Sequence, residues 1–116
     1  MKIEKFCTPK DGQMAQLNKA RWSVARLIEL SRDFEVFSIP LKGLNVYYTY
    51  ADLSLREMVT HIEAVNNADL KYPIILDEDG ELLDGRHRIM KAMLNRDESI
   101  NAVRFDKNPS PCEVKD

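Results

Sequence analysis

The feature that most constrains the fold of this chain is a strand, a tight turn, a second strand and a helix that follow one another without spare residues. The apolar run 72–76 predicts a compact strand. Residues 77–80 predict a turn whose glycine takes positive φ, and residues 81–83 form the second arm of a hairpin. Asp84-Gly85 then breaks the strand, and apolar spacing predicts a helix over about 86–95.

The rest of the chain adds helices and strands around this segment. Ser54 and Glu57 have the spacing of a capping box, so they mark the start of an amphipathic helix. Periodicity predicts helices at about 13–32 and 55–66, and strands at 34–39, 45–50 and 99–105. This mixture is typical of an α+β domain. From Lys107 onward, two prolines and scattered charges predict a tail.

Composition and charge limit the classes of protein to which this chain can belong. Hydrophobic residues make up 44% and charged residues 31% of the 116 residues, as in a folded single domain. The formal net charge of -2 gives no overall attraction to nucleic acid. We expect no membrane span and no signal peptide. Cys7 and Cys112 lie near opposite ends, and we predict free thiols in the cytoplasm.

The predicted helix after Gly85 has an unusual charge pattern. Arg86, His87 and Arg88 occupy its first three positions, and no acid follows before Arg96. A helix start normally favours acids, because its free N–H groups carry partial positive charge. A bound phosphate removes this conflict, since N–H groups and guanidinium donors then converge on one anion.

The neighbouring residues fit the same interpretation. Gly85 lets the backbone approach a ligand closely, and Asp84 is placed to orient an arginine or His87, or to help hold Mg²⁺ carried by a nucleotide. The sequence therefore predicts a phosphate site at Asp84, Gly85, Arg86, His87 and Arg88. The alternative is that the basic side chains only pair with the acidic turn at 77–79.

Other polar and aromatic residues support weaker hypotheses. Glu57 and His61 share one helix face, which suits either half of a metal site or a surface pair, and we predict no metal site. The tyrosines of 45–50 either line a pocket or simply occupy a strand. Trp22 is predicted to be a packing anchor. The sequence identifies no catalytic residue.

Residues 72–92, with the sequence YPIILDEDGELLDGRHRIMKA, resemble the core of the ParB/sulfiredoxin-like superfamily. The resemblance covers roughly 34–105 and implies a small mixed sheet flanked by helices. It divides the chain into a helical extension (1–33), the main domain (34–106) and a tail (107–116). Gly85, His87 and Arg88 match the Gly and two Arg positions of the ParB motif that contacts nucleotide phosphates. Arg86 replaces the ParB glutamate and the sulfiredoxin cysteine.

The nearest pattern in that superfamily is Asp-Gly-His-His-Arg, found in free-serine kinases and in proteins called ParB-like nucleases. Asp84, Gly85, His87 and Arg88 match it, and Arg86 replaces its first histidine. The resemblance implies a domain that binds a nucleoside di- or triphosphate, with or without Mg²⁺, as an NTPase or small-molecule kinase. The alternatives are a DNA-binding or nuclease module, and a regulatory domain that binds a protein partner without catalysis.

Overall fold

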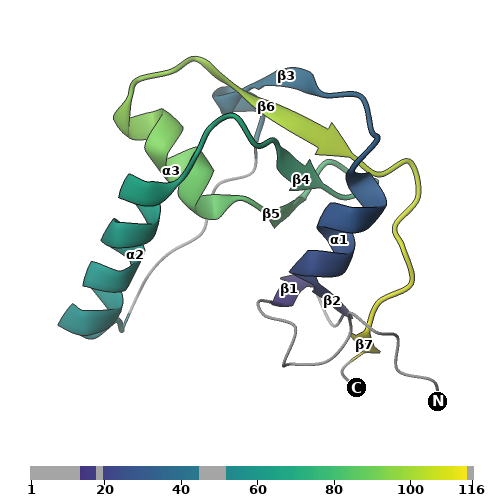
Figure 1. Cartoon of the computed structure of the whole chain (residues 1–116), viewed down its shortest axis with the longest axis horizontal. Coiled ribbons are helices and arrows are strands. Elements are labelled where there is room, and N and C mark those ends of the chain that lie inside the picture. The colour runs from purple at the N-terminus through teal and green to yellow at the C-terminus, as the bar shows by residue number, and fades with distance from the viewer. Residues whose placement is uncertain (1–13, 18–19, 45–51, 115–116) are drawn as a thin grey trace.

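The computed structural model describes residues 14–17, 20–44 and 52–114, except for the side chains of Met14, Glu113 and Val114. Three α-helices are interspersed among the strands in this part of the chain (Figure 1). The elements are β1 (Met14–Leu17), β2 (Ala20–Ser23), α1 (Val24–Ser31), β3 (Phe37–Pro40), the 3₁₀ turn η2 (Leu41–Gly43), α2 (Leu55–Asn67), β4 (Ile74–Leu76), β5 (Leu82–Asp84), α3 (Arg86–Leu94), β6 (Ser99–Arg104) and β7 (Glu113–Val114).

The main sheet is mixed and has the strand order β3-β6-β4-β5. The strands β4 and β5 form the predicted antiparallel hairpin, and α3 then returns the chain so that β6 pairs parallel to β4. The edge strand β3 pairs antiparallel to β6. An α+β fold with a mixed sheet is therefore confirmed for the described residues.

Each face of the main sheet is covered by different elements (Figure 1). Ile74 and Ala102 point to the face on which Ile89 and Ala92 of α3 pack. Ile75 and Val103 point to the opposite face, where Trp22 and Leu27 pack. Both faces are covered because neighbouring strand residues point to opposite sides. The burial of all three residues of β4 follows from its position between these two cores.

The predicted helix at 13–32 is wrong in its first half. Residues 14–17 and 20–23 form the antiparallel strands β1 and β2, and of the described residues in this range only those of α1 are helical. Ser23 ends β2 and caps α1, because its hydroxyl accepts a hydrogen bond from the backbone N–H of Arg26 at 3.4 Å. Trp22 is a packing anchor, as predicted: it is 3% exposed and its Nε1 donates to the Pro109 carbonyl.

Much of the predicted tail also belongs to the fold. The small second sheet has the order β1-β2-β7, so the segment after Lys107 returns to pair with β2. The backbone N–H of Cys112 donates to the Arg21 carbonyl at 2.7 Å. Cys112 is disulfide-bonded, so the prediction of a free thiol is wrong there. Cys7 and the predicted strand at 45–50 lie outside the described residues.

Two helices expose apolar side chains. The helix α2 begins with the predicted capping box of Ser54 and Glu57, but most of its apolar stripe faces away from the cores. In α3, Ile89 and Ala92 are buried, whereas Met93 is 54% exposed. Met93 lies about 100° around the helix from Ala92, which turns it away from the sheet. No helix in the described ranges combines the length and apolar character needed to cross a membrane.

Candidate functional site

The candidate site is built where β5 turns into α3. Gly85 is the N-cap of α3, with φ 121° and ψ 20°, and it provides no side-chain cap. A Cβ at this position would lie 2.5 Å from Cγ2 of Ile74, so the close approach of α3 to β4 requires glycine. The first turn of α3 contains no acidic residue, so its N–H groups are not neutralised by a carboxylate of that turn.

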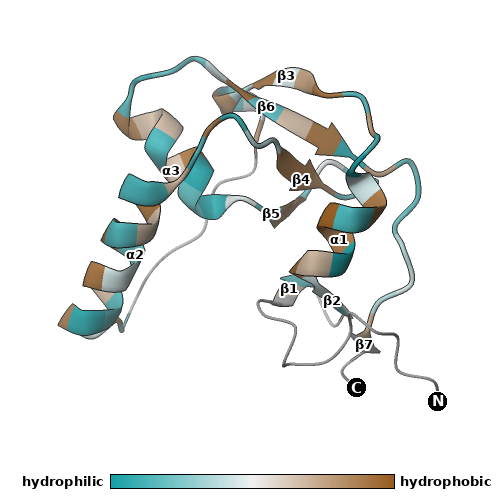
Figure 2. Ribbon diagram, viewed as in Figure 1, coloured by the Kyte–Doolittle hydropathy of each residue, from teal (hydrophilic) through white to brown (hydrophobic). Residues whose placement is uncertain are grey.

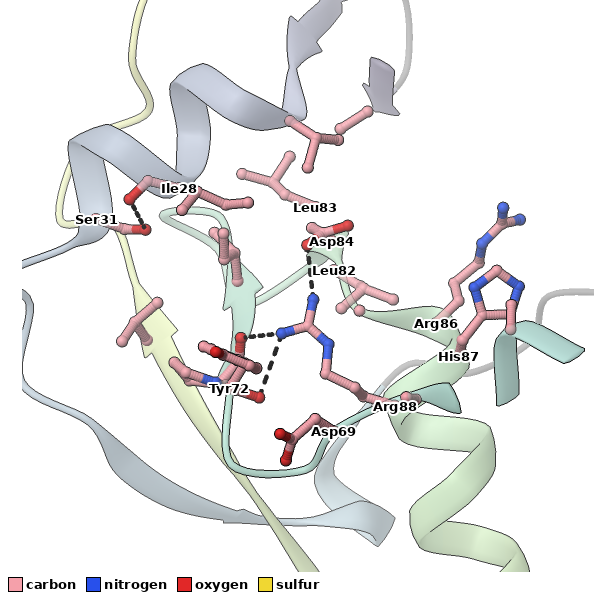
Figure 3. Close-up of a pocket in the computed structure, with 18 of the residues that line it drawn as sticks. Ile28, Ser31, Asp69, Tyr72, Leu82, Leu83, Asp84, Arg86, His87 and Arg88 are labelled. Atoms are coloured by element: carbon pink, nitrogen blue, oxygen red, sulfur yellow. Dashed lines mark hydrogen bonds and ion pairs between the residues drawn. The ribbon is translucent and has the colours of Figure 1, made fainter. Parts of the chain in front are cut away.

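This first turn opens into a large pocket. The cavity measures about 1270 Å³ and is lined by residues of α1, α2, the sheet and the start of α3. All five predicted site residues, 84–88, line it. Figure 3 shows Ile28 and Ser31 of α1 on one side of the cavity and Arg86 and His87 on another. The pocket therefore combines an apolar part against α1 with a basic part at α3.

Arg88 is occupied by contacts within the protein. Its Nη2 donates to Oδ2 of Asp84 at 2.7 Å, and its Nη1 donates to the carbonyls of Pro73 at 2.6 Å and Tyr72 at 3.2 Å (Figure 3). The side chains of Arg88 and Asp84 are only 18% and 17% exposed. Arg88 therefore joins the end of β5, the start of α3 and the segment before β4. Arg88 therefore holds these three segments in position relative to one another.

His87 contacts a residue that sequence reasoning did not associate with the site. Its Nε2 lies 2.8 Å from Nδ1 of His61 on α2. The Glu57 side chain, which the sequence places on the same helix face as His61, accepts a hydrogen bond from the backbone N–H of Ser54 in the capping box. No sequence pattern predicts this contact between the two histidines, because the contact depends on how α2 packs beside α3.

Lys91 and the acidic turn have structural roles. Lys91 Nζ donates to the carbonyls of Ala68 at 2.6 Å and Asn66 at 3.2 Å, so it stabilises the end of α2. Asp77 is buried, and its Oδ1 accepts from the N–H groups of Asp79 and Glu81. Among the described residues, no group of three or more His, Cys, Asp or Glu side chains is placed to hold a metal.

The electrostatics of the site oppose a proton on His87. Burial lowers the pKa of His87 most, the positive charges of His61 and Arg86 lower it further, and Asp84 opposes them. The cation of Arg88 also lies in this turn, where it is paired with Asp84. With Nε2 of His87 directed at His61, Nδ1 is the ring nitrogen that remains for a ligand.

Acidification is expected to destabilise the protein partly through His87. Because the pKa of His87 is lower in the folded than in the unfolded state, the unfolded chain binds more protons near and below pH 6.5, roughly the usual imidazole pKa. The free energy of unfolding should therefore fall as pH falls through this range. Urea unfolding at pH 7.5 and 5.5 measures the fall, which should be smaller in His87→Gln. An equal fall in both proteins would contradict this assignment.

Comparison of the chain with family models, with curated proteins and with solved structures finds no match.

Proposed function

We propose that the pocket binds the phosphate groups of a nucleotide at the first turn of α3. The observation that carries this proposal is the combination of an uncapped helix start, no acid in its first turn, and the side chains of Arg86 and His87 lining the same cavity. An anion at this position would accept hydrogen bonds from backbone N–H groups and from cationic side chains.

The contacts assign different roles to the basic residues. Arg88 is paired with Asp84, which offsets part of its charge. Arg86 is exposed, lines the pocket and adds a second cation at the start of α3. A phosphate near His87 would favour its protonated form and offset the effects that lower its pKa. Nucleotide affinity should accordingly increase as pH falls towards 6.

The remainder of the pocket suits a base and sugar. Its volume, about 1270 Å³, exceeds what phosphate alone requires. Tyr72 lines the cavity and is 57% exposed, and Lys71 Nζ lies over its ring at 5.1 Å from the centroid, so a nucleobase would stack on the other face of the ring. The apolar side chains of Val24 and Ile28 line the α1 side. These features favour a nucleotide over inorganic phosphate.

The resemblance of residues 72–92 to the ParB/sulfiredoxin-like superfamily supports the same ligand class. We propose that the protein binds a nucleotide and that the nucleotide brings Mg²⁺ with it. If the nucleotide is turned over by an NTPase or kinase reaction, Asp69 is the better candidate for an acid–base carboxylate. Asp69 is exposed in the pocket, whereas Asp84 is engaged by Arg88.

Nucleotides are expected to stabilise the protein against heat. A ligand at 100 times its Kd adds about 2.7 kcal/mol, which corresponds to a rise in Tm of roughly 10 °C for a domain of this size. Thermal-shift titrations with ATP, ADP, CTP and GTP, each with and without Mg²⁺, measure this rise. Arg86→Ala should weaken binding about tenfold or more, because it removes a charge-assisted contact.

The control variant is Lys42→Ala, which removes an exposed cation in η2, outside the pocket lining. It should bind nucleotide like the wild type. Absence of any shift with nucleotides or inorganic phosphate would contradict the proposal. Salt-dependent retention on DNA without a nucleotide response would support the nuclease-module alternative, and neither response would support a non-enzymatic regulatory domain.

A further inference from the structure

The outer face of α2 exposes a continuous apolar stripe. Leu55, Met58, Val59 and Ile62 are 82%, 46%, 52% and 51% exposed. They recur at helical spacing and so form one strip along the helix. Figure 2 shows apolar segments on α2, at the side of the molecule away from α1. Exposed apolar strips of this kind mark interaction surfaces more often than isolated exposed side chains do.

The direction of the stripe is set by the packing of α2 on α3. The inward side of α2 carries Val65, which is 4% exposed, and His61, which contacts His87. At about 100° per residue, the centre of the stripe lies roughly 90° around the helix from the midpoint between Val65 and His61. The stripe is therefore not the seam between α2 and α3. Nothing in the described part of the chain buries it.

Two residues of opposite charge lie beside the stripe. Arg56 and Glu63 lie about two helical turns apart, so both flank the same edge of the stripe. When two copies of such a helix pack antiparallel about a twofold axis, residues on one flank of the first copy meet the same flank of the second. Arg56 of one copy then lies near Glu63 of the other, and the reverse pair forms at the same time.

The apolar residues fit the same register. With the twofold axis at the level of Thr60, Met58 lies opposite Ile62 of the second copy, and Val59 lies beside the axis. Apolar contacts therefore occupy the centre of the contact, and opposite charges lie at its edge. Such a dimer would bury the apolar stripe and would pair each charged residue with an opposite charge of the other copy.

We propose that the α2 stripe is the interface of an antiparallel homodimer of this chain. The partner is a second copy because the charge pattern is complementary to itself. This proposal is independent of the nucleotide site, since the four stripe residues do not line the pocket.

Analytical ultracentrifugation of the full chain over about 5–500 μM tests the proposal. We expect a concentration-dependent monomer–dimer equilibrium in the wild type. Ile62→Glu should abolish the dimer, because it places two carboxylates in the apolar contact. The matched control is Leu30→Glu, which alters an exposed apolar residue, 44%, on α1 outside the pocket lining and should leave the equilibrium unchanged. Circular dichroism checks that both variants fold.

Charge reversal gives a test that does not depend on loss of folding. Arg56→Glu and Glu63→Arg should each weaken the dimer about tenfold, because two repulsive pairs replace two attractive ones. The double variant should return the dissociation constant close to the wild-type value. A monomer at every concentration would overturn the proposal, as would a dimer insensitive to Ile62→Glu or a double variant no tighter than the single ones.

Discussion

Replacing Gly85 with alanine is expected to lower the free energy of unfolding by about 3–5 kcal/mol. Two separate effects contribute. The backbone at Gly85 has φ 121°, which an L side chain rarely adopts. The added Cβ would also lie 2.5 Å from Cγ2 and 2.9 Å from Cβ of Ile74, a fully buried residue that cannot move away freely. Urea unfolding at neutral pH measures the loss.

Gly80→Ala separates these two effects. Gly80 also has positive φ, 83°, but no atom lies within 4 Å of the position that its Cβ would occupy. Its substitution should cost only about 1–2 kcal/mol, the penalty for the backbone conformation. If Gly85→Ala were no more destabilising than Gly80→Ala, close packing between the start of α3 and β4 would not be the reason for glycine at residue 85.

Replacing Arg88 with alanine should destabilise the protein by about 2–4 kcal/mol even when no ligand is present. The substitution leaves the carboxylate of Asp84 without its partner, and the carbonyls of Tyr72 and Pro73 lose their donor. Arg88→Lys should recover only part of this loss, because an ammonium group lacks the planar fork that reaches all three acceptors. Urea unfolding without nucleotide or phosphate measures both changes.

A double-variant cycle identifies the origin of this loss. Asp84→Ala combined with Arg88→Ala should cost less than the sum of the single substitutions, because the pair is lost once. A different result would change the role of Arg88. If Arg88→Ala left stability unchanged but removed nucleotide binding, Arg88 would be a direct ligand whose pairing with Asp84 opens in the complex.

Local sequence signals predicted the hairpin and helix of the site. The apolar residues of 72–76, the glycine turn at 77–80 and the interruption at Gly85 act over a few residues each, so they are visible without tertiary structure. The capping box at the start of α2 is equally local, and both of its hydrogen bonds are present. The ParB/sulfiredoxin-like resemblance remains a hypothesis built on this same segment.

Residues 14–23 show why helical periodicity gave a wrong prediction for the first half of the segment 13–32. The apolar residues of this segment match a helix nearly as well as they match two strands, and β2 also pairs with β7, at the other end of the chain. Trp22 adds a contact to the Pro109 carbonyl, which no local pattern reveals. Strand pairing is non-local, so its energy does not appear in a short sequence window.

The sequence by itself determined where α2 and α3 begin, that Gly85 separates β5 from α3, and that a basic cluster lies at that helix start. Only the tertiary structure decided what each basic residue does. Arg88 is paired with Asp84, and His87 contacts His61 because α2 packs beside α3. The same packing turns the apolar stripe of α2 outward. Helix caps and turns depend on neighbouring residues, whereas side-chain partners and exposed faces depend on how separate elements pack.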